Sequence, residues 1–235
     1  MELMVVVLSL NRLPYTKRCL KALFDSRGAF DCVIVDNGSN YKVVDFLRSN
    51  WDGVSNDRGG SFRLVENGIN LGVGGGMNVA LKLRKSGQHV MKLDNDVEVP
   101  FKRCPKWMSK MRNILETDIG ISHIGFCFYN KREISKMRVV ERVGKTSWKS
   151  SLMRPENGMI LGAAVMFRDS VVSSVGEFSE ERLYGNIDTD YSRRCLMHGE
   201  GWYWMGPKAI HMDRGDLGKD SDLLSKIKEE SSRKY

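Results

Sequence analysis

Two aspartates two positions apart, in the segment Asp94-Asn95-Asp96, are the residues best suited to do chemistry. They follow the apolar run at residues 90–93, so both carboxylates stand just beyond the end of a predicted buried strand. Oxygen ligands of this kind suit Mg²⁺ or Mn²⁺ bound to a diphosphate. A simple acidic turn would contain the same residues, and the pair by itself does not separate the two interpretations.

A second candidate is the glycine-rich segment 67–78, which reads Asn-Gly-Ile-Asn-Leu-Gly-Val-Gly-Gly-Gly-Met-Asn and leads into a predicted helix. Glycines let a ligand approach the backbone closely, and the free N–H groups at a helix start attract anions. The segment lacks the Gly-Lys-Ser/Thr of a P-loop, and it does not follow the first strand as a dinucleotide-binding fingerprint does. A flexible turn with a helix cap remains the alternative.

Three further polar residues lie late in the chain. His211 follows a strand-like segment at 202–207, where a lone histidine suits a structural role as well as a metal. Asp188 and Asp190 stand at a predicted helix start, where acidic residues also serve as caps and dipole partners. None of these residues identifies a site in isolation.

The elements that must position these groups alternate between strands and helices. In the first hundred residues, strands are predicted at 3–8, 33–35, 62–65 and 90–93, and helices at 11–24, 43–47 and 73–85. The second half has predicted helices at 105–115, 170–175 and 188–198, strands at 119–128, 159–167 and 202–205, and one amphipathic turn at 223–227. This alternation is typical of an α/β fold with a parallel sheet, and the clusters 36–39 and 94–96 fall at its carboxyl edge, where ligands bind.

Composition narrows the class of protein. The chain has 235 residues and a net charge of +8, from 37 Lys and Arg against 29 Asp and Glu. Such a surplus favours an anionic partner but says nothing about fold. No apolar run reaches the length of a membrane span, and the apolar opening lacks the features of a signal peptide. The five cysteines form no Cys-x-x-Cys pair, so we expect reduced thiols and a cytoplasmic protein.

Taken together, the motifs resemble family 2 glycosyltransferases of the GT-A fold, and most closely their rhamnosyltransferase-like branch. The resemblance covers roughly residues 4–212 and rests on segments 5–12, 33–39, 70–78, 93–96, 162–178 and 188–193. It implies a mostly parallel central sheet with helices on both faces. It also implies a single catalytic domain over 1–212, with a nucleotide-sugar-binding half at 1–100 and an acceptor-binding half at 101–212. Residues 213–235 form a charged tail.

The resemblance also implies a mechanism, a metal-dependent transfer from a UDP-, dTDP- or GDP-linked sugar to an acceptor hydroxyl with inversion. Asp188 would be the general base, and Mn²⁺ or Mg²⁺ would be held by Asp94, Asp96 and His211. The residues expected to bind the nucleotide-sugar are Ser9, Asn11, Asp36, Asn37, Asn70, Gly74, Asn78 and Asp94. Two positions depart from the family pattern, since Ile187 stands where a glutamate is usual and Leu10 replaces an aromatic residue.

The basic surplus points to the acceptor. Residues 102–154 contain thirteen Lys and Arg against four Asp and Glu, so this segment alone accounts for the excess. One candidate acceptor is DNA with a hydroxymethylated base, as in phage enzymes, bound through its phosphates in the cytoplasm of an infected host. The other is a lipid-linked or cell-surface glycan, with the segment resting on an anionic membrane. The charge tips the balance slightly towards DNA. A third hypothesis is a non-catalytic nucleotide-sugar- or DNA-binding protein on the same scaffold.

Overall fold

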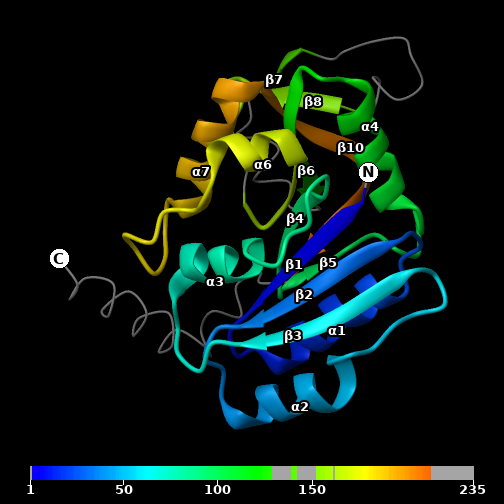
Figure 1. The fold of residues 1–235 in the computed structure, drawn as a ribbon. Coiled ribbons are helices and arrows are strands. Elements are labelled where there is room, and N and C mark those ends of the chain that lie inside the picture. The colour runs from blue at the N-terminus through cyan, green and yellow to red at the C-terminus, as the bar shows by residue number, and fades with distance from the viewer. Residues whose placement is uncertain (1, 129–138, 142–151, 161, 213–235) are drawn as a thin grey trace.

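A single twisted sheet runs through the computed structural model, which describes residues 2–128, 139–141, 152–160 and 162–212 (Figure 1). Its strands are β1 (Leu3–Ser9), β2 (Phe30–Asp36), β3 (Gly60–Glu66), β4 (His89–Asp94), β5 (Val97–Glu98), β6 (Ile121–Phe128), β7 (Val139–Glu141), β8 (Leu152–Pro155), β9 (Ala164–Phe167) and β10 (Glu200–His211). The helices are α1 (Leu13–Phe24), α2 (Tyr41–Trp51), α3 (Gly72–Leu81), α4 (Trp107–Thr117), α6 (Asp169–Val175), α7 (Ile187–Cys195) and the 3₁₀ turn η2 (Leu196–His198). The strand order is β3-β2-β1-β4-β9-β6-β10-β8-β7, with β5 paired to β10.

The strands β1 to β4 of the first half pair in parallel, because each connection between them crosses over through a helix. β1 pairs in parallel with β2 and with β4, and β2 pairs in parallel with β3. All seven residues of β1 are buried, so the strand reads as a continuous apolar run rather than as an alternating one. Val5 and Val7 face one side of the sheet, whereas Met4 and Val6 face the other.

Helices cover both faces, as the sequence predicted. α1, α2 and α4 pack on the face that contains Val5 and Val7, and α3, α6 and α7 pack on the opposite face (Figure 1). α1 places Cys19, Leu20 and Leu23 in the core at helical spacing. Among the described residues, none of the helices combines the length and the apolar character that crossing a bilayer requires.

The sheet differs in detail from the predicted elements. The strand predicted at 159–167 begins only at Ala164, because Gly162 and Ala163 lie in a turn. This short strand, β9, runs antiparallel to both of its neighbours, β4 and β6. The helix predicted at 188–198 ends at Cys195 and continues as η2. The short strands β5, β7 and β8 were not predicted, and the predicted turn at 223–227 and tail at 213–235 lie outside the described residues.

The connections bring the carboxyl ends of β1, β2 and β4 to one edge. β1 lies between β2 and β4, so the chain leaves it in one direction and later returns to its other side. Such a switch point is where open α/β sheets bind ligands. The C-terminal end of β10 pairs antiparallel with β5. This pairing brings His211 opposite Val97 and next to the Asp94–Asp96 turn. The Met212 N–H donates to the Asp96 carbonyl at 2.8 Å and fixes this arrangement.

Candidate active site

Ser9 and Asp36 end β1 and β2 and are register partners in the parallel pair. Both side chains are buried, at 0% and 1% exposure. One Asp36 oxygen accepts from the Ser39 N–H at 3.0 Å, whereas its Oδ1 and the Ser9 hydroxyl have no hydrogen-bond partner in the part of the chain that the structure describes. Buried oxygens are nearly always paired, so two adjacent unpaired oxygens mark a place where a polar ligand can bind.

The turn after β1 is held in an uncommon conformation. Asn11 and Arg12 both have left-handed backbone angles, with φ of 55° and 54°. The Asn11 N–H donates to the Ser39 hydroxyl at 2.8 Å, and its side-chain oxygen accepts from the Asn40 N–H at 2.9 Å. These bonds join the turns that follow β1 and β2 and keep Asn11 at the edge of the sheet.

Asp96 is the centre of a second cluster. Its Oδ2 accepts a hydrogen bond from Arg12 Nη1 at 2.9 Å. Its Oδ1 lies 3.4 Å from His211 Nε2, within the distance of an ion pair. Burial would raise the pKa of Asp96, but His211 and Arg12 outweigh it and lower that pKa below its usual value. Asp96 is therefore a carboxylate at neutral pH.

Asp94 and Asp188 meet at a buried lysine. Lys92 Nζ donates to Asp94 Oδ1 at 2.6 Å and lies 3.3 Å from Asp188 Oδ1. Burial would lower the pKa of Lys92, but Asp188 and Asp94 raise it above the ordinary lysine value, so the ammonium stays charged. Burial raises the pKa of Asp94 to about 6 against the opposing effect of Lys92, and the negative charge of Asp188 adds to the increase.

The predicted metal ligands are only partly brought together. His211 and Asp96 are adjacent, but Asp94 turns to Lys92, and the described residues contain no group of three or more acidic, histidine or cysteine side chains placed to hold a metal ion. The buried Asp96 Oδ1 beside a histidine nitrogen is nevertheless an oxygen and nitrogen donor pair of the kind that Mn²⁺ accepts. These two side chains fit a divalent ion.

Four residues expected to contact the donor lie in close contact with other parts of the chain. Asn37 donates to the Asn70 side chain and the Gly72 carbonyl at 3.1 and 2.9 Å, and it accepts from the Leu71 N–H at 3.2 Å. Asn78 bonds both backbone groups of Phe178. The remaining two are Asn70, which also accepts from the Gly72 N–H, and Gly74, where a Cβ would overlap the Ser179 carbonyl. The three asparagines help to hold the loops around the site, and the role of all four residues in donor binding stays a prediction.

Sequence reasoning missed three residues of the site. Lys92 was counted within the apolar run at residues 90–93, and Arg12 was given no role within segment 5–12. Tyr184 carried no motif at all, yet it is 52% exposed and near enough to Asp94 for that carboxylate to affect it. Burial of its hydroxyl is the main cause that raises the pKa of Tyr184, and the negative charge of Asp94 adds to it. A charged residue inside a buried strand is the one signal that could have revealed Lys92.

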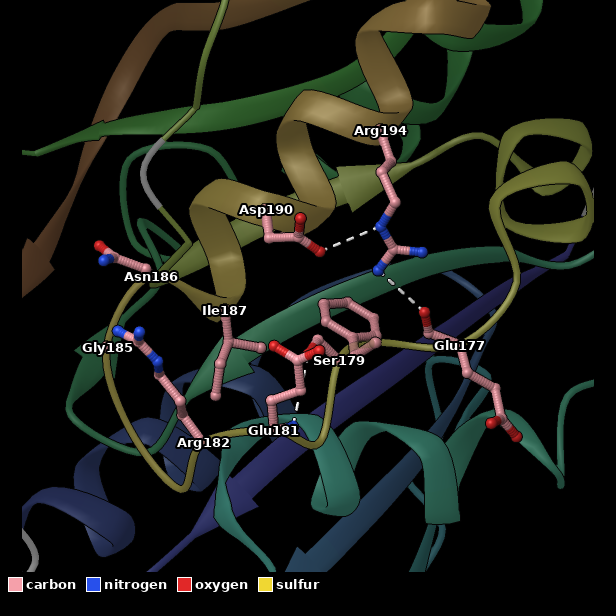
Figure 2. Close-up of a pocket in the computed structure, with 10 residues that line it drawn as sticks. Glu177, Ser179, Glu181, Arg182, Gly185, Asn186, Ile187, Asp190 and Arg194 are labelled. Carbon is pink, nitrogen blue, oxygen red and sulfur yellow. Dashed lines mark hydrogen bonds and ion pairs between the residues drawn. The ribbon is translucent and has the colours of Figure 1, made fainter. Parts of the chain in front are cut away.

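A cavity of about 500 Å³ lies beside the start of α7 (Figure 2). The loop between α6 and α7 and the first turns of α7 line it, and Asn186 and Ile187, immediately before Asp188, are among the lining residues. Figure 2 shows Arg194 held on one side by Asp190 and on the other by the Glu177 carbonyl, at 3.0 and 2.9 Å. The full lining is Glu177, Phe178, Ser179, Glu181, Arg182, Gly185, Asn186, Ile187, Asp190 and Arg194.

The sheet order and the acidic residues at its carboxyl edge define an α/β protein of the GT-A class. The sequence profile described as "Glycosyl transferase family 2" matches residues 4–175, which is well over half of the chain. The chain therefore belongs to glycosyl transferase family 2. A search of the curated proteins finds no significant match.

Solved structures confirm the fold. S. aureus TarS 1–349 superposes with a TM-score of 0.67 at 15% identity, over 97% of this chain and 65% of that one. The mannosyltransferase PcManGT from Pyrobaculum calidifontis, in complex with GDP-Man and Mn²⁺, gives 0.68 at 16% identity, over 98% and 64%. GalNAc-T7 with UDP, GalNAc and Mn²⁺ gives 0.67 at 13%, over 92% and 44%. The chain thus spans less than two thirds of the length of each of these structures.

Proposed function

We propose that this protein transfers a sugar from a nucleotide-linked donor to an acceptor hydroxyl, with Asp188 as the general base. The observation that carries the proposal is a pair of buried oxygens, Ser9 Oγ and Asp36 Oδ1, which have no hydrogen-bond partner among the described residues. Two further buried carboxylate oxygens, Asp96 Oδ1 and Asp188 Oδ1, form ion pairs with His211 and Lys92 at 3.4 and 3.3 Å. The sequence predicted that these four residues, Ser9, Asp36, Asp96 and Asp188, bind donor or metal or act as the base. Family membership supports the same activity.

Each of these residues has a distinct task. Ser9 and Asp36 bind the nucleoside, because their free oxygens can accept its N–H and O–H groups. Residues 1–100 thereby bind the donor, and residues 101–212 bind the acceptor. UDP and GDP are the first nucleotides to test, since TarS was solved with UDP-GlcNAc and PcManGT with GDP-Man, and dTDP completes the panel.

The reaction is a displacement at the anomeric carbon. Asp188, whose side chain is 32% exposed, accepts the proton of the acceptor hydroxyl as the new C–O bond forms. The acceptor oxygen attacks the face opposite the bond to the nucleoside diphosphate, and that bond breaks with its oxygen keeping the electron pair. Because attack and departure are on opposite faces, the product has inverted configuration. A divalent cation held by Asp96 and His211 would offset the charge on the leaving diphosphate. Whether the sugar is a hexose, a pentose or a rhamnose-like deoxysugar is decided by the donor panel.

The acceptor is best placed in the cavity beside α7. Its lining is mixed in charge, with three carboxylates and two arginines, and it lies directly before the base in the chain. Such a surface suits the hydroxyls of a neutral glycan better than a polyanion. The mixed charge therefore favours the glycan acceptor over DNA.

Modified DNA remains the second candidate, and the basic surplus of residues 102–154 is the observation that favours it. Seven of the thirteen basic residues, however, lie outside the described part of the chain. Binding to duplex DNA should fall steeply between about 50 and 200 mM salt if phosphates are bound. Absence of binding at low salt would eliminate this acceptor. The five buried free cysteines agree with a cytoplasmic location, which is the host cytoplasm for a phage-encoded chain.

The test of the activity is release of nucleoside diphosphate in the presence of Mn²⁺. Asp188→Asn should lower kcat about 10²- to 10⁴-fold with little change in the donor KM. Asp45→Asn, an exposed carboxylate on α2, is the matched control and should keep full activity. Full activity of Asp188→Asn would refute the assignment of the base. If no donor is turned over although a nucleotide binds, the non-catalytic hypothesis replaces this one.

A further inference from the structure

Lys92 is a lysine in the middle of a buried strand, with a side chain that is 1% exposed. Its neighbours Met91 and Leu93 face the core on one side of the sheet, whereas Lys92 and Val90 point to the other side. Moving an ammonium out of water costs several kcal/mol unless it is well paired. A buried lysine at this position therefore needs a reason, and its contacts provide one.

Three oxygen atoms surround the ammonium group. Asp94 Oδ1 lies at 2.6 Å and the Gly162 carbonyl at 2.8 Å, and Asp188 Oδ1 is 3.3 Å away. An ammonium has three N–H donors, so these neighbours match its capacity. Asp94 is two residues farther along β4 and points to the same face, whereas Asp188 comes from the first turn of α7.

The carboxylate of Asp188 is fixed from two sides. Lys92 approaches it with a positive charge, and Gly162 packs so closely that a Cβ at that position would overlap the carboxyl group. The three N–H donors of the Lys92 ammonium are matched by oxygens of the chain, which leaves none for a substrate, whereas the Asp188 side chain is 32% exposed and can meet one. Any effect of Lys92 on the reaction must therefore pass through the carboxylates that it binds.

We propose that Lys92 is a positioning residue, which holds the Asp188 carboxylate in the orientation that receives the acceptor proton. The proposal rests on the proposed function, in which Asp188 is the base. Lys92 also places a positive charge between Asp94 and Asp188, which allows two carboxylates to face the same small volume. Neutralising Asp94 alone would not require a contact between Lys92 and Asp188 at the start of α7.

A double-mutant cycle between Lys92→Met and Asp188→Asn tests the proposal. Lys92→Met alone should lower kcat about 10- to 10²-fold, with a donor KM that stays within about threefold. Added to Asp188→Asn, it should cost nothing more, because its effect passes through the carboxylate that is already gone. Losses that multiply would show a general structural role and overturn the proposal, as would an unchanged kcat in Lys92→Met. Full activity in Asp188→Asn would overturn the proposed function as well.

Two further experiments test the proposal if Lys92→Met does not fold or if no activity can be measured. If Lys92→Met does not fold, the cycle is repeated in an Asp94→Asn background, which removes the carboxylate that would be left unpaired, with Asp94→Asn as the reference. The same lack of further loss is expected, and multiplied losses would again refute the idea. In a crystal structure of the Lys92 variant that folds, the Asp188 carboxylate should move away from Gly162. An unmoved carboxylate would overturn the proposal without any assay.

Discussion

Asn78 connects α3 to the loop that leads to Asp188, and its replacement by alanine is the sharpest test of how the site is held. Its Nδ2 donates to the Phe178 carbonyl at 3.0 Å and to Glu180 Oε1 at 2.7 Å, while its Oδ1 accepts from the Phe178 N–H at 2.8 Å. Asn78 is 2% exposed and Phe178 is 3% exposed, so water cannot replace these bonds. The truncation therefore leaves both backbone groups of Phe178 without a partner.

The expected cost follows from these two orphaned groups. A buried polar group without a partner costs about 1–3 kcal/mol, and partial relaxation of the loop brings the total for Asn78→Ala to about 2–4 kcal/mol. For a chain of this size, that is a decrease in Tm of about 5–12 °C. All three contacts of the amide are internal, so nucleotide affinity measured well below the Tm should change by less than about threefold.

The assay is thermal unfolding followed by circular dichroism, with nucleotide binding measured by calorimetry on the same samples. Asn50→Ala is the control, because the Asn50 amide donates to the Phe46 carbonyl on the exposed surface of α2, and the Tm of this variant should hardly change. An Asn78→Ala protein with an unchanged Tm but lost nucleotide binding would refute the reasoning. It would show that the amide contacts the donor, as the family resemblance implies.

The remaining predictions concern geometry, pH and metal. Gly162→Ala should lower kcat about 10²-fold by displacing Asp188, and full activity would contradict the close packing. Burial lowers the pKa of His89 and of His123 to about 4, so the unfolded chain binds more protons than the folded one below about pH 6.5. The free energy of unfolding should then fall by about 1.4 kcal/mol per pH unit for each histidine between about pH 6.5 and 4, and His123→Gln should halve this slope in urea titrations. EDTA should abolish turnover and Mn²⁺ restore it, with a higher Mn²⁺ requirement in His211→Ala; activity in EDTA would remove the metal from the mechanism.

Much of the fold follows from local pattern. The runs that became β1, β2 and β4 are mostly apolar, as expected of strands buried on both faces, and Lys92 is the charged exception inside β4. The short strands β5 and β8 were not predicted, because two to four residues are too few to show the alternation of buried and exposed side chains. Both strands pair with β10, which lies in a distant part of the chain. β9 was predicted too long because Gly162 and Ala163 continue its apolar run without joining the sheet.

The sequence by itself determined which side chains stand at the carboxyl edge of the sheet, because strand ends and turn residues are local features. Asp36, Asp94 and Asp96 were found in this way. Only the tertiary structure decided what these groups bind. Asp94 accepts a hydrogen bond from Lys92, and Asp96 is next to His211 because β10 returns to β5. The physical reason is that burial is encoded in the periodicity of each segment, whereas a partner contributed by a distant segment is fixed only when the whole sheet and its helices pack together.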